Sequence, residues 1–109
     1  MKAQPLKREG ISYHPCEPDV ATHLRFYSPG PLSTQILPVQ IKGTRAGTGN
    51  WTWNGDVDRP TLKPSILNDF RPHDPLVNHI FITDGQVIFL PDCTHEFAGQ
   101  TLDLLEVEP

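Results

Sequence analysis

Apolar and polar positions alternate with a period of two in several short segments, a pattern typical of half-buried strands. The clearest example is "VNHIFITDGQVIFL", 77–90, in which two such runs are separated by Asp84 and Gly85. An Asp-Gly pair between alternating runs is a strong signal for a two-residue hairpin turn. The register of that hairpin places His79 opposite Leu90 at its open end. We therefore expect a β-hairpin over this segment.

Shorter runs continue the pattern along the chain. Strands or extended segments are expected over 23–27, 34–43, 51–56, 59–67 and 101–107, with a glycine turn over 45–50. Trp51 and Trp53 share a face, and we expect one in the core and the other partly exposed. At most one helical turn is expected, around residues 94–98. These elements predict an all-β or nearly all-β protein, either a small sandwich or a partly open barrel.

The first 22 residues differ from the rest of the chain. Residues 1–22 are polar and rich in proline and charge, and they show no convincing period. We interpret them as an N-terminal arm, partly ordered at best. Residues 23–109 are then a single β-rich domain, large enough for one modest core. Twelve prolines and eight glycines in 109 residues fit a protein rich in strands and turns.

Charge and composition exclude several functions. The net charge of −4 gives no general attraction to phosphate backbones, so we expect no nucleic-acid partner. No apolar stretch of 18 residues exists, and no apolar segment follows the basic residues near the N-terminus. We therefore expect no membrane partner and a cytoplasmic location. The two cysteines, Cys16 and Cys93, are expected to be free thiols.

Three side chains that handle protons or metals lie together in "FLPDCTHEFAG", 89–99: Asp92, Cys93 and His95. Taken alone, this pattern is most simply a turn, in which Asp92 caps backbone N–H groups and Cys93 fills a small apolar space. The hairpin register, however, brings His79 to the same place. Two histidines, a carboxylate and a nearby hydroxyl are the material of a Ser-His-Asp site.

Four motifs occur in the order "WTWNGD", "RPTLKPSIL", "HIFITDGQVIF" and "DCTHEFAGQT". In these motifs the chain resembles a family of small phage and bacterial proteins of formerly unknown function, over roughly residues 24–104. Members of that family resemble the peptidase component of bacterial ubiquitin-like conjugation (Bub) operons. The resemblance implies serine-type hydrolysis that processes or removes a ubiquitin-like modifier.

The chain also departs from the family pattern. Typical members carry a C-P-G-C knuckle after the first strand and a cysteine directly before the histidine of the H-x-F segment. Here those places hold Ser28, Pro31 and Asn78. Structural zinc sites usually have four cysteine or histidine ligands, and the retained Cys93 and His95 supply only two. We therefore expect neither zinc nor another cofactor.

The resemblance also favours one nucleophile. Of the four serines, Ser65 alone lies in a family motif, although a serine in an extended segment is often only a solvent-facing residue. With Ser65 as the nucleophile, His79 is the preferred general base and Asp92 the carboxylate that orients it. His95 is either the base instead or a donor that stabilises an oxyanion. Spacing alone does not separate these two roles.

These observations predict a serine-type peptidase or deconjugase that acts on the C-terminal tail of a ubiquitin-like modifier or on its conjugates. An extended tail of this kind would bind at an open sheet edge by strand addition. In a variant of this hypothesis, Cys93 is the nucleophile and pairs with a histidine. A second hypothesis is a non-enzymatic phage or bacterial accessory or binding module, derived from a zinc-binding domain that has lost its metal. A third is a metal-dependent hydrolase with His79, His95 and Asp92 as ligands.

Overall fold

The computed structural model describes residues 1–41 and 50–107. The glycine turn expected over 45–50 falls almost wholly outside them. Within these ranges the chain forms nine strands and one short 3₁₀ helix, η1 (Pro18–Val20). The strands are β1 (Gln4–Glu9), β2 (Ser12–Pro15), β3 (His23–Tyr27), β4 (Thr34–Ile41), β5 (Trp51–Trp53), β6 (Leu62–Asp69), β7 (Val77–Thr83), β8 (Gln86–Phe89) and β9 (Thr101–Asp103). None of the described helical residues belongs to a helix long and apolar enough to cross a membrane.

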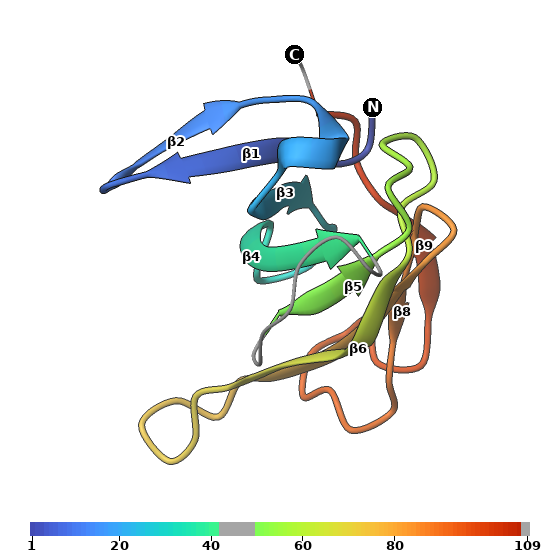
Figure 1. Cartoon of the computed structure of the whole chain (residues 1–109). Helices are drawn as coiled ribbons and strands as arrows, with labels where there is room; N and C mark the ends of the chain where they lie inside the picture. The colour runs from blue at the N-terminus through green and yellow to red at the C-terminus, as the bar shows by residue number, and fades with distance from the viewer. Residues whose placement is uncertain (42–49, 108–109) are drawn as a thin grey trace.

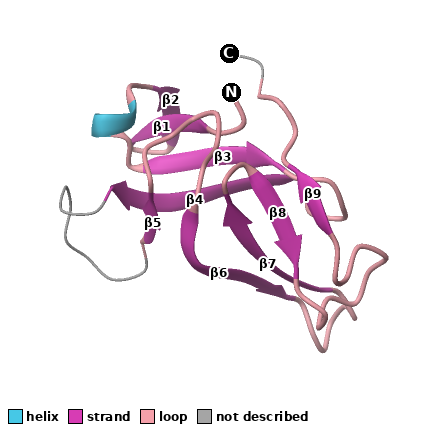
Figure 2. Ribbon diagram, turned by 90° about the vertical axis from the view of Figure 1, so that its right-hand side faces the viewer, coloured by secondary structure: helices cyan, strands magenta, loops and turns pink. Residues whose placement is uncertain are grey.

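The described strands form one sheet in the order β2-β1-β3-β4-β5-β6-β7-β8-β9 (Figure 1). All neighbours are antiparallel except β4 and β5, which are parallel. Figure 2 shows the sheet curling so that the ends of β3 and β9 approach each other, and Leu105 forms an isolated bridge with Tyr27 there. The prediction of an all-β, partly open structure is confirmed.

The hairpin of β7 and β8 has the predicted register. Thr83 pairs with Gln86 and Ile80 with Phe89. Asp84 and Gly85 have φ angles of 54° and 79°, as a tight hairpin turn with two left-handed residues requires. At most one helical turn was expected around residues 94–98; a hydrogen-bonded turn lies there, in which Ala98 N–H donates to His95 O at 3.2 Å, and the described helical residues lie at η1.

The concave inner face of the sheet holds the core. Alternate positions of the central strands point inward, and their side chains are almost fully buried. The largest of them are Trp53, Phe26, Phe89, Leu24, Leu62, Ile66, Ile80 and Ile82. Trp53 is 1% exposed, whereas Trp51 is partly buried at the margin of the core, as expected for this pair. Because most inner positions hold buried apolar side chains, the exposed polar side chains of these strands lie on the opposite face, here called the outer face.

The N-terminal residues do not form the arm that the sequence predicts over 1–22. β1 and β2 form a hairpin, and β1 also pairs with β3, so the hairpin extends the sheet (Figure 1). Ala3 and Leu6 are 0% and 2% exposed. Ala3 belongs to the core cluster and Leu6 is buried outside it, although the prolines and charges of this segment hide the strand pattern in the sequence.

Removing the Leu6 side chain tests whether this hairpin is part of the cooperative fold. Leu6→Ala should lower the free energy of unfolding by about 2–5 kcal/mol, because it leaves a cavity beneath β1. Ile11→Ala is the matched control: Ile11 is 96% exposed, so the change should stay within about 0.5 kcal/mol. Denaturant unfolding measures both. Equal and small losses would show that the hairpin is not part of the cooperative fold.

Candidate active site

Ser65 lies in an irregular part of β6. Leu62 pairs with Ile82 and Ile66 with Ile80, so four steps along β6 match two steps along β7. Such a β-bulge bends the strand and redirects side chains, and bulges are common beside active sites. The even number of extra residues keeps Leu62 and Ile66 on the inner face and leaves Ser65 half-buried on the other side.

Trp51 supports the bulge from the neighbouring strand. Its indole Nε1–H donates a hydrogen bond to the backbone carbonyl oxygen of Ser65 at 3.3 Å. A partly buried tryptophan needs a partner for its N–H, and here that partner is the backbone of the candidate nucleophile. This hydrogen bond holds the backbone of Ser65 at a point where the regular hydrogen-bond ladder between strands is interrupted by the bulge.

His79 extends from the outer face of β7 and is hydrogen-bonded at both ring nitrogens. Its Nε2 lies 3.1 Å from the Oγ of Ser65. Its Nδ1 lies 3.0 Å from Oδ2 of Asp92 and 3.3 Å from Oδ1. The His79 side chain is 25% exposed and the Asp92 side chain 59% exposed. The structure therefore links hydroxyl, imidazole and carboxylate in a continuous chain.

Asp92 is held in place by the turn that follows β8. Leu90 N–H donates to His79 O at 2.9 Å, which continues the hairpin ladder by one residue. Pro91 has no N–H and ends the ladder. The Cys93 thiol then lies 3.3 Å from both the N–H and the carbonyl oxygen of His79, and Thr94 N–H donates to Val77 O at 3.0 Å. The turn is thus attached to the backbone of β7 on both sides of Asp92.

Cys93 is a structural residue in this arrangement. It is 8% exposed, and its sulfur faces the His79 main chain rather than the imidazole. The variant hypothesis with Cys93 as nucleophile therefore lacks the thiol–imidazole contact that activation requires.

The structure does not bring His95 to this group. Its Nε2 is hydrogen-bonded to Oδ1 of Asn78 at 2.8 Å, and its Nδ1 accepts from the Phe97 N–H at 3.2 Å. Asn78 is 2% exposed and precedes His79 on β7, so the two residues point to opposite faces. His95 also packs edge-on against the buried ring of Phe89, with ring centroids 5.1 Å apart. It is a core-side residue and not the base or the oxyanion donor proposed from its spacing.

The three ligands proposed for a metal do not converge either, because His95 lies on the inner side and His79 on the outer face. Among residues 1–41 and 50–107, no three His, Cys, Asp or Glu side chains are grouped in a way that could hold a metal ion. Asn78, which stands where the family has a cysteine, bonds His95 and also donates to Asn68 at 3.4 Å. Ser28 is buried and donates to the carbonyl oxygen of Pro29. The side chains of Asn78, His95 and Ser28 therefore all form hydrogen bonds within the protein.

A charged pair borders the triad. The Arg71 guanidinium donates two hydrogen bonds to the Asp69 carboxylate, at 3.0 and 2.8 Å, and the Arg71 backbone N–H donates a third. These bonds lower the pKa of Asp69 from 3.8 to about 2. The pKa of Arg71 is raised, mainly by Asp69 and to a smaller extent by the charge of Asp92. The Arg71 guanidinium is therefore close enough to the Asp92 carboxylate for the two charges to interact.

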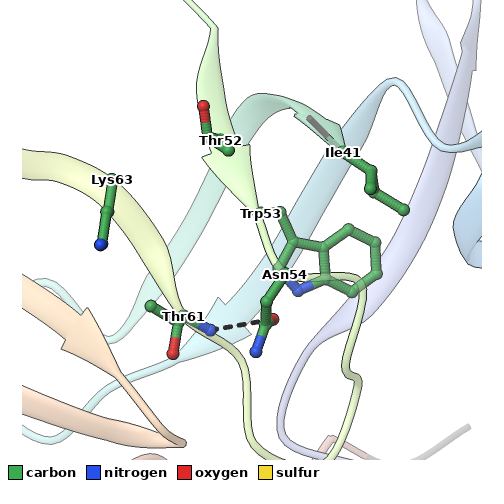
Figure 3. A pocket seen from close by; sticks show the side chains of 6 residues that line it. All are labelled: Ile41, Thr52, Trp53, Asn54, Thr61 and Lys63. Atoms are coloured by element: carbon green, nitrogen blue, oxygen red, sulfur yellow. Dashed lines mark hydrogen bonds between the residues drawn. The ribbon is translucent and has the colours of Figure 1, made fainter. Parts of the chain in front are cut away.

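A pocket of about 350 Å³ lies beside the start of β6 (Figure 3). It is lined by Ile41, Thr52, Trp53, Asn54, Thr61 and Lys63. Asn54 is one of the lining residues, and its Oδ1 accepts the Thr61 N–H at 3.1 Å and the Asp56 N–H at 3.2 Å. These bonds hold the connection between β5 and β6, so the amide oxygen is already used for structure. The pocket is a neighbour of the triad and contains none of its three side chains.

A small β protein with a hydrogen-bonded Ser-His-Asp chain on an exposed face has the constellation of a serine hydrolase. Comparison with known families leads to the same class. Residues 14–90 match the model of the bacterial ubiquitination-like system serine protease (BubE), and the chain belongs to that family. The match includes Ser65 and His79 and ends before Asp92. No curated protein and no solved structure matches the chain.

The sequence missed two supporting residues. The sequence does not say which of Trp51 and Trp53 is the partly exposed one, and the bond from Trp51 to the Ser65 carbonyl depends on the β5–β6 pairing, which no local pattern shows. Arg71 was not singled out. The sequence feature that could have identified Arg71 is its D-x-R spacing from Asp69 at the end of a strand. This spacing indicates a local ion pair, but it does not indicate that Arg71 lies near Asp92.

The ion pair between Asp69 and Arg71 should make the stability of the fold depend on pH. Because the pKa of folded Asp69 is below its unfolded value, the pair stabilises the fold above that value and the effect is lost as pH falls towards 2. The Asp69 carboxyl carbon should titrate near pH 2 by NMR. In Arg71→Gln its midpoint should return towards 3.8. A midpoint near 3.8 in the unmodified protein would contradict the pairing.

Proposed function

We propose that this protein is a serine-type peptidase that processes or removes a bacterial ubiquitin-like modifier. The observation that carries the proposal is the hydrogen-bonded chain from Ser65 Oγ through both nitrogens of His79 to Asp92. Membership of the BubE family, described as serine proteases of a bacterial ubiquitination-like system, supports both the reaction and the kind of partner.

In the proposed reaction, Ser65 Oγ attacks the carbonyl carbon of the scissile bond while His79 Nε2 accepts its proton. Asp92 accepts the Nδ1–H hydrogen bond, which keeps Nε2 free to act as the base and stabilises the imidazolium that forms. The tetrahedral intermediate then collapses as His79 donates the proton to the departing amine. Water, activated by the same imidazole, hydrolyses the acyl-enzyme and releases the new carboxyl terminus.

The developing negative charge on the carbonyl oxygen needs a hydrogen-bond donor. Ser65 lies outside the paired registers that β6 forms with β5 and with β7. We assign its own backbone N–H as the candidate donor, since a bulge frees main-chain groups next to the nucleophile. The Trp51 bond to the carbonyl oxygen of Ser65 holds this peptide segment in position.

The position of the triad also constrains how a substrate approaches. β6 and β7 are interior strands of the described sheet, whose edges are β2 and β9. A tail added to either edge strand would not reach Ser65. The modifier tail reaches Ser65 across the outer face of β6 and β7, or by strand addition along the side of β6 beyond Lys63, where the described ladders record no pairing with β5.

Incubation with a ubiquitin-like precursor and with its conjugates tests the function directly. Mass spectrometry should show removal of the residues after the modifier tail, or release of the modifier from its target. Ser65→Ala should reduce the rate by about 10⁶-fold, to below detection. Cys93→Ser and His95→Gln, matched changes at the residues outside the triad, should remain active when folded. Activity that survives in Ser65→Ala would exclude Ser65 as the nucleophile, and no activity in the unmodified protein would favour the binding-module hypothesis.

Asp92→Asn tests the orienting role separately. The amide removes the negative charge and permits the wrong histidine tautomer, so kcat should fall by up to about 10⁴-fold. Asp69→Asn is the control, because it alters a nearby carboxylate that does not contact His79. Steady-state kinetics on the same substrate measures both variants. Equal losses in the two variants would show a general charge effect and no specific role for Asp92.

A further inference from the structure

Two large apolar side chains border the triad on the outer face. Leu67 is 55% exposed and Phe81 is 38% exposed. Leu67 pairs directly with His79 across the ladder, and Phe81 follows His79 by two residues on β7. Leu67 and Phe81 are here called the flanking pair.

The register fixes where the flanking pair lies relative to the reacting atoms. Directly opposed residues of an antiparallel ladder have Cβ atoms about 5 Å apart, which places Leu67 beside the imidazole of His79. Residues two apart on one strand are separated by about 6.6 Å and share a face. Leu67 is therefore about 6.6 Å along β6 from Ser65. Phe81 is the same distance along β7 from His79, in the direction of the β6 bulge. The Ser65–His79 hydrogen bond lies between the two apolar side chains.

A substrate must cover the flanking pair when it reacts. The scissile carbon has to come within about 3–3.5 Å of Ser65 Oγ. An extended polypeptide advances about 3.3 Å per residue, so the side chains within two residues of the cleaved bond lie over Leu67 and Phe81. Burying this exposed apolar surface against an apolar side chain is favourable. Leu67 and Phe81 have no side-chain group that could form a hydrogen bond or ion pair with a polar or charged side chain of the substrate.

From this placement, and resting on the proposed function, we infer that the flanking pair sets substrate preference. The occupant is the extended tail of the substrate, carrying a bulky apolar side chain within two residues of the cleaved bond. Leu67 and Phe81 contact that side chain and select against polar or charged residues at the same position. They are substrate-contacting residues and take no part in proton transfer.

Two fluorophosphonate probes of equal length test this inference, one with a phenylalkyl arm and one with an ethylene-glycol arm. Both modify the catalytic serine, with fluoride as the leaving group and a bond formed from Ser65 Oγ to phosphorus. The apolar probe should label the protein at least about 10-fold faster, the lower end of what one well-placed apolar contact provides. Intact mass spectrometry over time gives both rates.

Leu67→Thr and Phe81→Thr introduce a β-branched strand former and remove the apolar contact. Each should reduce the ratio of the two rates towards one, because the rate with the phenylalkyl probe falls. Ile36→Thr is the matched control, because Ile36 is 40% exposed on β4 and has no place in the triad. That variant should keep the wild-type ratio.

The possible results separate the two proposals. Labelling of Ser65 at equal rates by both probes would overturn the inference and leave the peptidase proposal standing. No labelling by either probe would overturn the peptidase proposal and the inference with it. If the threonine variants instead abolish self-association in sedimentation and leave the rate ratio intact, the flanking pair binds a second copy of the chain and the inference is wrong.

Discussion

The attachment of the turn after β8 to the main chain of His79 is the constraint on which the site depends. Leu90 and Cys93 bond the backbone of His79, and Thr94 bonds that of Val77. These contacts leave Asp92 between two fixed points, with its carboxylate 3.0 Å from Nδ1 of His79. The Asp92 side chain is well exposed, so few neighbouring side chains hold it. Its position is set by the backbone of the turn. Without this attachment, nothing would restrict the exposed Asp92 side chain to positions near the His79 imidazole.

The sheet divides its two faces between stability and chemistry. The inner face holds an apolar core that includes Trp53, Ile66 and Ile80, and the hydrogen-bonded Asn78 and His95 lie on the same side. The outer face holds the triad. A bulge in β6 allows this division, because it displaces Ser65 towards His79 without changing which residues of β6 face the core. A chain of 109 residues can therefore carry the three side chains of the candidate site with little loss of core.

Local patterns in the sequence were sufficient for the hairpin and for the neighbourhood of His79. The Asp84-Gly85 turn determines the register, and the register carries His79 to the turn that contains Asp92. The same reasoning could not place His95, because nearness along the chain does not say which face a side chain occupies; its partner is Asn78, one position and one face away from His79. The bulge around Ser65 depends on pairing with both neighbouring strands, and no local signal specifies it. The N-terminal hairpin was hidden by prolines and charges, although Leu6 is almost fully buried.

The most direct test concerns the tautomer of His79. Asp92 can hold the ring in the productive state only if the proton of the neutral imidazole is on Nδ1, which leaves Nε2 free to accept from the Ser65 hydroxyl. A long-range ¹H–¹⁵N correlation spectrum of the histidine side chains distinguishes the two nitrogens. For neutral His79 we expect a protonated Nδ1 and an unprotonated Nε2. A neutral ring with its proton on Nε2 would donate to Ser65 and could not activate it, and that result would contradict the Ser65–His79–Asp92 mechanism.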